Sequence, residues 1–403
     1  MNDGSRTIVV EDARGGTPLG YVAIDSTIEG RAAGGLRMAP DVSLDELKKL
    51  ARAMTLKYGF VGLPQGGAKA GVLGDSEQGT ERRSAILRRF AKAILPLLER
   101  REYVPYSDLG TSDAEIRQML ESVGLRRQHR GHPSGIYTAG TVFEAARAAA
   151  TARGLSMEKS RVVIEGFGEV GRPLAGRFVR ARARVVAIST SFGGVYNPCG
   201  LDIGRLRSKA EQMGSIFVKK SAAGESIEKS RLKEVPADIF CPCARHDTVQ
   251  VSDVARLAAR ILSCGANCPV TPEAERLLWQ GGVVCVPDFV ANCGGVLGGT
   301  MDFCGWRPEE IFSLIEHRFG GAVTGLIRDA MAKGKPLREV AEDVAITRWQ
   351  EVKQRTEHPS AAGRFFRIGI TLYRAGWVPA RLVSRLSTRY FNGRIPQSRN
   401  HDF

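Results

Sequence analysis

Two lysines in one short stretch have the residue type and the setting for catalysis in this chain of 403 residues. Lys57 closes a run with helical periodicity, and Lys69 follows a Gly66-Gly67 turn. Glycine permits close backbone approaches that a side chain would block, so Lys69 is expected to project from a tight, apolar turn. A lysine held in that way is a common catalytic group, although the pattern also fits an ordinary turn followed by a solvated lysine.

A carboxylate and an arginine are the next candidates. Asp108 lies in the loop Asp108-Leu109-Gly110-Thr111, directly after a short run that we expect to be a strand. From this setting alone, an aspartate is better explained as a turn or cap residue. Arg37 follows Gly34-Gly35, where a bend beside a strand leaves it available for a polar contact.

A glycine-rich segment predicts dinucleotide binding. Gly166-Phe167-Gly168-Glu169-Val170-Gly171 comes between a β-rich run at 161–165 and a helical segment, and a second β-rich run follows at 184–188. In this strand–turn–helix–strand setting the glycines permit the turn and let the backbone approach a pyrophosphate. The helix N-terminus then faces the phosphates.

The second β-rich run does not end in the acidic residue that commonly binds the ribose hydroxyls. Ser189-Thr190-Ser191 stands there instead, and Thr190 could hydrogen-bond either cofactor. Because no carboxylate at this point would repel a 2′-phosphate, the sequence leaves both NAD and NADP open.

Hydrophobic periodicity indicates the elements that must position these residues. In the first third of the chain we expect short strands near the N-terminus, a helix capped at Ser43 with Lys57 on its apolar stripe, and a helix over 80–99. Further on we expect an Ala-rich helix over 142–152, with β-like runs that alternate with helices as a parallel sheet requires, at 237–242, 260–267 and 282–288.

We therefore predict an α/β protein of two domains with a cleft between them. A mixed α/β substrate-binding domain covers residues 1–136, and a Rossmann-like doubly wound dinucleotide-binding domain covers 137–305. Helices over 306–403 are expected to pack back on the first domain and to end in a basic tail.

The formal net charge is +15, and roughly half of the excess lies in the last fifty or so residues. A solvated basic tail or a subunit contact explains this distribution better than nucleic-acid binding. All eight cysteines lie between Cys199 and Cys304 without a Cys-x-x-Cys pair, so we expect small buried side chains and no metal site. The chain has neither a bilayer-spanning apolar run nor a signal-peptide pattern, and we expect a cytoplasmic protein.

Motifs in both predicted domains resemble the glutamate/leucine/phenylalanine/valine dehydrogenase family, in the family's order. The resemblance covers roughly residues 30–295. It rests on Gly34-Gly35-Leu36-Arg37, Lys57, Pro64-Gln65-Gly66-Gly67-Ala68-Lys69, Asp108-Leu109-Gly110-Thr111, Thr138, Gly166 to Gly171, Gly265-Ala266-Asn267 and Asn292-Cys293-Gly294-Gly295-Val296.

The resemblance implies the reversible oxidative deamination of an L-amino acid to a 2-oxo acid and ammonia with NAD or NADP, in a homo-oligomer whose first domain also serves oligomerisation. It implies that Lys57 binds the substrate α-carboxylate, Lys69 polarises the attacking water, and Asp108 is the general acid and base. The cofactor would contact Thr138, Gly166, Gly168, Glu169, Val170, Gly171, Thr190, Asn267 and Asn292.

The substrate pocket departs from the glutamate pattern of the family. Glutamate enzymes carry a lysine where Ala33 stands and a serine where Gly299 stands, and Tyr106 occupies a position that is usually small. Together with Gly35, these residues predict a pocket for an aliphatic or aromatic side chain. Gly193-Gly194-Val195-Tyr196-Asn197-Pro198 looks more like the glutamate branch, and Arg31 could replace the missing lysine, so glutamate stays an alternative. A nucleotide-binding regulatory protein without catalysis is an alternative of another class.

Overall fold

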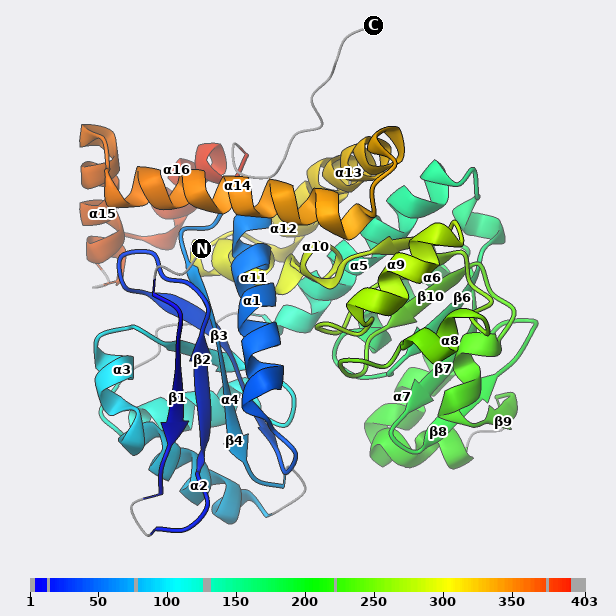
Figure 1. The fold of residues 1–403 in the computed structure, drawn as a ribbon, viewed down its shortest axis with the longest axis horizontal. Coiled ribbons are helices and arrows are strands. Elements are labelled where there is room, and N and C mark those ends of the chain that lie inside the picture. Colours follow the sequence, from blue (N-terminus) through cyan, green and yellow to red (C-terminus); the bar gives the residue numbers. More distant parts are fainter. Residues whose placement is uncertain are drawn as a thin grey trace, which may run out of the picture. The chain divides into compact units, whose positions relative to one another are not determined.

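The computed structural model describes residues 4–12, 15–75, 79–125, 132–220, 223–374 and 377–392. These residues form two compact units (Figure 1). The first unit contains the described residues up to 125 and those from 345 to 379. The second contains the described residues from 132 to 344 and from 380 onward.

A five-stranded mixed sheet forms the centre of the first unit, in the order β1-β2-β4-β3-β5. β2 lies between β1 and β4 and is antiparallel to both, and β3 and β5 continue the sheet parallel to β4. The bounds are β1 Arg6–Val10, β2 Gly20–Ile24, β3 Ala32–Ala39, β4 Gly66–Leu73 and β5 Val104–Ser107.

Helices cover both faces of this sheet (Figure 1). Val22 packs with the helices α2 (Thr80–Ala93), α3 (Leu95–Glu99) and α4 (Asp113–Glu121), whereas the next residue, Ala23, packs with α1 (Leu44–Phe60). This alternation follows from the two-residue period of a strand. The helix predicted over 80–99 breaks at Ile94, because Pro96 in the second position of α3 has no N–H to continue α2.

A seven-stranded sheet forms the centre of the second unit, in the order β12-β11-β10-β6-β7-β8-β9. Five strands are parallel, as predicted: β6 Arg161–Glu165, β7 Arg184–Thr190, β10 Ile239–Pro242, β11 Ile261–Ser263 and β12 Val284–Val286. β8 (Gly193–Tyr196) and β9 (Glu225–Ile227) add antiparallel pairs. The two residues between β7 and β8 are too few for the crossover that a parallel pair requires.

The helices of the second unit begin with α5, which is longer than predicted and includes Thr138. Their bounds are α5 Ser134–Ala152, α6 Gly171–Arg180, α7 Ile203–Met213, α8 Val251–Val254, α9 Pro272–Gln280, α10 Asp288–Ala291 and α11 Gly294–Phe303. The Gly166–Gly171 segment connects β6 to α6, as the sequence predicts for a dinucleotide-binding turn.

The C-terminal helices are divided between the two units, whereas the sequence led us to expect all of them on the first domain. They are α12 (Pro308–Leu314), a π-helical turn (Ile315–Phe319), α13 (Gly320–Lys333), α14 (Leu337–Glu357), α15 (Ala361–Arg374) and α16 (Ala380–Asn392). α12 and α13 belong to the second unit, as does α16, where Trp306 donates a 2.9 Å hydrogen bond to Ser387.

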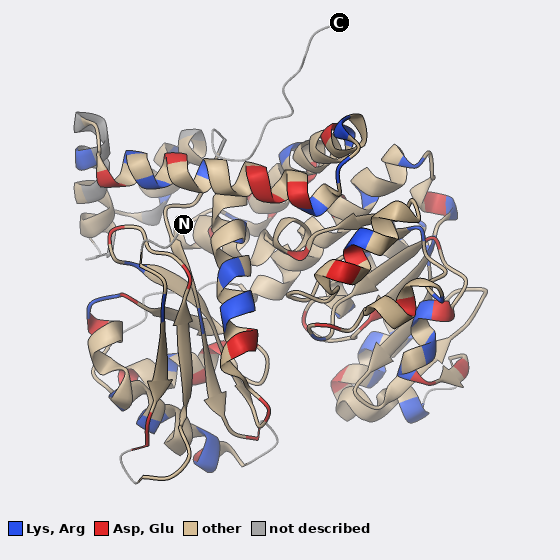
Figure 2. Ribbon diagram, viewed as in Figure 1, with Lys and Arg blue, Asp and Glu red and all other residues tan. Residues whose placement is uncertain are grey.

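α14 contributes to both units, which divide at Ala345. In the first unit, Trp349 donates its indole N–H to the Gln65 carbonyl at 3.2 Å. Gly59 allows this approach, because a Cβ there would lie 2.2 Å from the Ala345 carbonyl oxygen. Acidic and basic residues are interspersed along α14 (Figure 2).

Among the described residues, no helix is both long and apolar enough to span a bilayer. The same residues contain no group of His, Cys, Asp and Glu suited to a metal ion. Of the cysteines, Cys241, Cys264, Cys285, Cys293 and Cys304 are buried, and Cys199 is exposed.

Candidate active site

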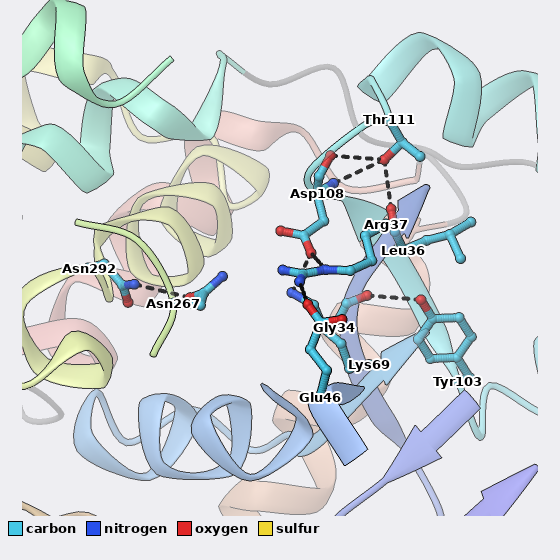
Figure 3. Close-up of polar contacts among 10 residues, drawn as sticks. All are labelled: Gly34, Leu36, Arg37, Glu46, Lys69, Tyr103, Asp108, Thr111, Asn267 and Asn292. Carbon is cyan, nitrogen blue, oxygen red and sulfur yellow. Dashed lines mark hydrogen bonds and ion pairs between the residues drawn. The ribbon is translucent and has the colours of Figure 1, made fainter. Parts of the chain in front are cut away.

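Two cations meet one oxygen of Asp108 in the first unit (Figure 3). Lys69 on β4 places Nζ 2.8 Å from Oδ2 of Asp108, and Arg37 on β3 places Nε 2.9 Å from the same atom. Through Nη1, Arg37 also forms an ion pair with Glu46 of α1. Lys69 is only 2 % exposed, so this ammonium is a buried group and not the solvated lysine of the alternative interpretation.

The loop that carries Asp108 is tied to β3 by Thr111 (Figure 3). The Thr111 hydroxyl accepts the Asp108 N–H at 3.0 Å and donates to the Leu36 carbonyl at 2.7 Å. Met38 donates its backbone N–H to the Leu109 carbonyl at 2.9 Å. Because these bonds join the loop to the strand that bears Arg37, Asp108 has a fixed position relative to that guanidinium.

The charge state of Asp108 follows from its surroundings. Burial alone would raise the pKa of its carboxyl, but the Lys69 ammonium and the Arg37 guanidinium outweigh burial and hold the pKa well below its usual range. Asp108 is therefore ionised at neutral pH. In the part of the chain that the structure describes, only Oδ2 of this carboxylate has a side-chain partner, so Oδ1 can accept a proton from a ligand.

Gly35 leaves the space that this cluster occupies. A Cβ at Gly35 would lie 2.7 Å from Cβ of Asp108 and 3.1 Å from Nζ of Lys69. The preceding residue, Gly34, is needed for another reason, since a Cβ there would lie 1.6 Å from the Ala68 carbonyl oxygen. Gly35 therefore leaves room for the side chains of Asp108 and Lys69, and Gly34 allows the close packing of β3 on β4.

The other predicted substrate residues of this unit lie on α1, β3 and β5. Lys57 is buried in the last turn of α1, with 5 % of its surface exposed. Ala33 is buried on β3, where its side chain is 1 % exposed, and Tyr106 of β5 pairs directly with Gly35. Tyr106 is 41 % exposed, which is unusual for so large a side chain beside a buried cluster.

In the second unit, the glycine-rich turn has the backbone that the sequence predicts. Gly166 has a φ of +92°, and a Cβ at Gly171 would lie 1.9 Å from the Gly166 carbonyl oxygen. A Cβ at Gly168 would meet nothing within 4 Å, so the turn leaves open space there. The residues fit a bound pyrophosphate, because the turn is tight where it packs and open where a ligand would approach.

Ser189 and Thr190 at the end of β7 support this turn. The Ser189 hydroxyl accepts the Gly166 N–H at 3.1 Å, and its carbonyl accepts the Phe167 N–H at 2.7 Å. The Thr190 hydroxyl donates to the Ser215 carbonyl at 2.8 Å and accepts the Phe192 N–H at 3.2 Å. Thr190 therefore has protein partners of its own.

The predicted nicotinamide residues lie at the ends of β11 and α10 and within α5. The Asn292 amide donates to Oδ1 of Asn267 at 3.0 Å (Figure 3) and to the Ala266 carbonyl at 3.0 Å. Its own Oδ1 is buried without a hydrogen-bond partner among the described residues. Thr138 donates to the Ser134 carbonyl at 3.1 Å.

Three further predicted site residues lie in the second unit. Glu169 places its backbone against α5, where a Cβ at Gly135 would lie 2.6 Å from the Glu169 carbonyl oxygen. Val170 is the N-cap of α6. Gly299 lies on α11, and a Cβ there would meet nothing within 4 Å.

Two family models match this chain, and together they account for both sheets. One, described as Glutamate/Leucine/Phenylalanine/Valine dehydrogenase, matches residues 134–356. The other, described as Glu/Leu/Phe/Val dehydrogenase, dimerisation domain, matches residues 5–125. The chain belongs to this family. It is an amino-acid dehydrogenase, an oxidoreductase acting on CH–NH2 donors.

Relatives and solved structures of the Glu/Leu/Phe/Val dehydrogenase family cover most of the chain. Glutamate dehydrogenase of Thermotoga maritima is 29% identical over 82% of this chain and 84% of its own length. A Leu-bound structure of hetero-hexameric glutamate dehydrogenase from Thermus thermophilus is 27% identical, with a TM-score of 0.74, and the match covers 86% of this chain and 88% of that one. L-tryptophan dehydrogenase from Nostoc punctiforme, at 21% identity and a TM-score of 0.61, shares the fold over 87% of this chain and 97% of its own.

The structure adds partners that the sequence did not reveal for this dehydrogenase. The sequence marked Arg37 only as available, whereas it binds both Asp108 and Glu46. In the sequence, Ser189 was of interest only because the end of the second β-rich run lacks a carboxylate. In the structure its hydroxyl accepts the Gly166 N–H and so supports the glycine-rich turn. A hydroxyl residue at the end of a strand beside a glycine turn is a signal that could have indicated this bond.

Proposed function

We propose that this dehydrogenase oxidatively deaminates an L-amino acid with an aliphatic or aromatic side chain, and not glutamate. In the forward direction, the amino acid, NAD(P)⁺ and water give the 2-oxo acid, ammonium, NAD(P)H and a proton. One observation carries the proposal: Ala33, where the family's glutamate enzymes carry a lysine, is 1 % exposed and brings no charge. A buried substrate carboxylate would lack its partner there.

The charges near Asp108 support the same conclusion. Lys69 and Arg37 are balanced by Asp108 and Glu46, so this cluster has no excess positive charge for a second substrate carboxylate. Arg31, the alternative cation, forms an ion pair with Glu29. A glutamate side chain would have to break that pair to gain a partner.

Aromatic residues near the predicted pocket support an apolar substrate. Burial raises the pKa of Tyr58 on α1, and the phenols of Tyr106 and Tyr103 raise it further. Tyr106 pairs with Gly35 across the sheet and is exposed enough to contact a ligand. In the second unit, Gly299 stands where the family's glutamate enzymes carry a serine, and nothing lies within 4 Å of its Cβ position.

Each cluster residue takes one part of the reaction under this proposal. Lys57 binds the α-carboxylate, and Lys69 stabilises the oxygen that water adds to the substrate carbon, where an ammonium is worth most in a dry site. Oδ1 of Asp108 accepts the proton of the substrate ammonium and returns it to the departing ammonia. The nicotinamide cofactor, held by the 166–171 turn and by Asn292, supplies the hydride acceptor when it is bound.

We also propose that both NAD and NADP are accepted. The end of β7 carries Ser189, Thr190 and Ser191 without a carboxylate, so a 2′-phosphate meets no like charge from this strand. Lys219 lies 5.7 Å from the ring centre of Phe192, two residues after Thr190. An exposed cation so close to the strand end favours an additional phosphate.

A spectrophotometric panel of amino acids with both cofactors tests the proposal. We expect leucine, phenylalanine or tryptophan to exceed glutamate about 100-fold or more in kcat/KM, since an unpaired buried carboxylate costs several kcal/mol. Ala33→Lys should raise the ratio of glutamate to leucine turnover about tenfold or more.

Glutamate turnover that equals or exceeds the others in the wild-type protein would refute the substrate assignment. If that activity disappears in Arg31→Gln, Arg31 replaces the missing lysine. No turnover of any amino acid, with NAD(P)H still bound, would instead favour a regulatory protein.

A further inference from the structure

The cluster around Asp108 contains one more cation than its chemistry needs. A single ammonium would suffice to ionise a buried carboxylate, yet Lys69 and Arg37 both donate to Oδ2, at 2.8 and 2.9 Å. Their two donors converge on the same oxygen and leave Oδ1 to the substrate. Because each buried charge carries a desolvation cost, the second cation beside Asp108 is expected to have a role of its own.

Arg37 is held by two carboxylates that come from different elements of the first unit. It is 5 % exposed, and its guanidinium lies between Asp108 on the loop after β5 and Glu46 on α1 (Figure 3). Burial would lower the pKa of Arg37, but the two carboxylates outweigh burial and raise it. A guanidinium stays charged at any working pH and fixes the direction of its donors, which an ammonium on a flexible stem does not.

Glu46 lies at the start of α1 and has a local role there. It stands three residues after the N-cap Ser43, where its backbone N–H binds the Ser43 hydroxyl at 3.2 Å. Its carboxylate forms an ion pair with Arg37. The helix start and the catalytic carboxylate are therefore joined through one guanidinium.

We propose that Arg37, anchored by Glu46, is a positioning residue that holds Asp108 through Oδ2 and so frees Lys69 to act on the substrate. The inference rests on the proposed function, in which Lys69 and Asp108 each act on a different atom of the substrate. When Lys69 turns to the substrate oxygen, Asp108 keeps a charged partner and neither swings away nor becomes an unpaired buried charge. Arg37 itself does not touch the substrate.

The pH dependence of kcat gives a readout that a merely structural role would not move. The charged and titratable groups facing Asp108 are Lys69 from β4, Arg37 from β3 and Tyr103 before β5, with Glu46 of α1 behind Arg37. Since a cation within about 4–6 Å lowers a carboxyl pKa by roughly 1–3 units, Arg37→Met should move the acid limb of the kcat profile upward by about one unit or more. The sign is upward because Asp108 must be ionised to accept a proton.

Three further variants separate positioning from folding. Arg37→Lys keeps the charge and should shift the acid limb by less than half a unit. Glu46→Gln removes a negative charge behind Arg37 and should move the limb downward, the opposite sign. Lys233→Met breaks a buried ion pair of the second unit, Lys233 with Asp253 at 2.7 Å, and should lower the melting temperature without moving the limb.

The profiles are measured on the full chain with the best substrate of the panel, together with KM and thermal unfolding. We expect kcat of Arg37→Met to fall at least tenfold, and KM for the amino acid to change less than threefold. If Arg37→Met is active and its acid limb stays in place, the proposal is overturned. If Arg37→Met does not fold, an acid limb that stays in place in Glu46→Gln overturns it.

A wild-type protein without amino-acid turnover would contradict the proposed function instead. The interaction of Arg37 with Asp108 is then measured by thermal unfolding between pH 3 and 7. Because the folded pKa of Asp108 is lowered, its contribution to stability is present above the ordinary carboxyl pKa and is lost as pH falls. Relative to the matching Asp108→Asn variants, the stability lost between pH 7 and 3 should be smaller in Arg37→Met, because a folded pKa nearer the ordinary one leaves less stability to lose. An equal loss in the two backgrounds would overturn the proposal.

Discussion

Replacing Gly35 with alanine should disturb the catalytic side chains and leave the fold in place. The added Cβ would lie 2.7 Å from Cβ of Asp108, and ordinary contact begins near 3.4 Å, so the pair must separate by about 0.7 Å. The same Cβ lies 3.1 Å from Nζ of Lys69, the flexible end of a side chain that can move further. Since a displacement of about 1 Å in a catalytic group can cost about 100-fold in rate, we expect kcat to fall 10- to 100-fold.

Two other glycines make the comparison specific. Gly34→Ala pushes a Cβ to 1.6 Å from a backbone oxygen of β4 and should lower stability beyond the roughly 1–3 kcal/mol typical of overpacking. Gly321→Ala on α13 meets nothing within 4 Å and should leave both rate and stability near wild type. Stopped-flow single turnovers at saturating substrate, with urea unfolding of each variant, separate the two effects. A Gly35→Ala enzyme with kcat within twofold of wild type would refute the reasoning, because Asp108 and Lys69 would then not need their observed positions.

Two further predictions concern the cofactor turn and α14. Gly171→Ala, whose Cβ would lie 1.9 Å from the Gly166 carbonyl oxygen, should weaken NADH and NADPH binding at least tenfold in a fluorescence titration, whereas Gly176→Ala on the same helix should not. Trp349→Phe removes the indole donor to Gln65 and should lower the free energy of unfolding by about 1 kcal/mol without changing kcat. Equal NADH and NADPH binding by Gly171→Ala and Gly176→Ala would contradict the first prediction, and a lower kcat in Trp349→Phe would contradict the second.

The parts of the site that depend on local sequence could be predicted. The 166–171 turn and its flanking strand and helix follow from glycine spacing and β-rich runs, because a tight turn at Gly166 needs a positive φ that few residues adopt. The burial of Lys69 followed in the same way from Gly66-Gly67. These elements are set by residues within a few positions of one another.

The contacts that depend on sheet order could not be predicted. Arg37 and Asp108 are 71 residues apart, and they meet because β5 pairs with β3 instead of with β4. Glu46 has a satisfactory local role at a helix start, so nothing in the sequence indicated its ion pair with Arg37. The helices after residue 306 show apolar faces but not which sheet those faces meet, which is why their division between the units had to come from the structure.

The division of α14 has a consequence for how the protein is made. The first unit is incomplete until Trp349 reaches Gln65, a contact that spans 284 residues. At a synthesis rate of roughly 5–20 residues per second, β1–β5 and α1 leave the ribosome about 15–60 s before the segment that covers the end of α1. During that interval the second unit is being translated, and the nascent first unit exposes the apolar surface around Gly59. We therefore expect the first unit to stay prone to aggregation until this helix, encoded late in the message, has been made.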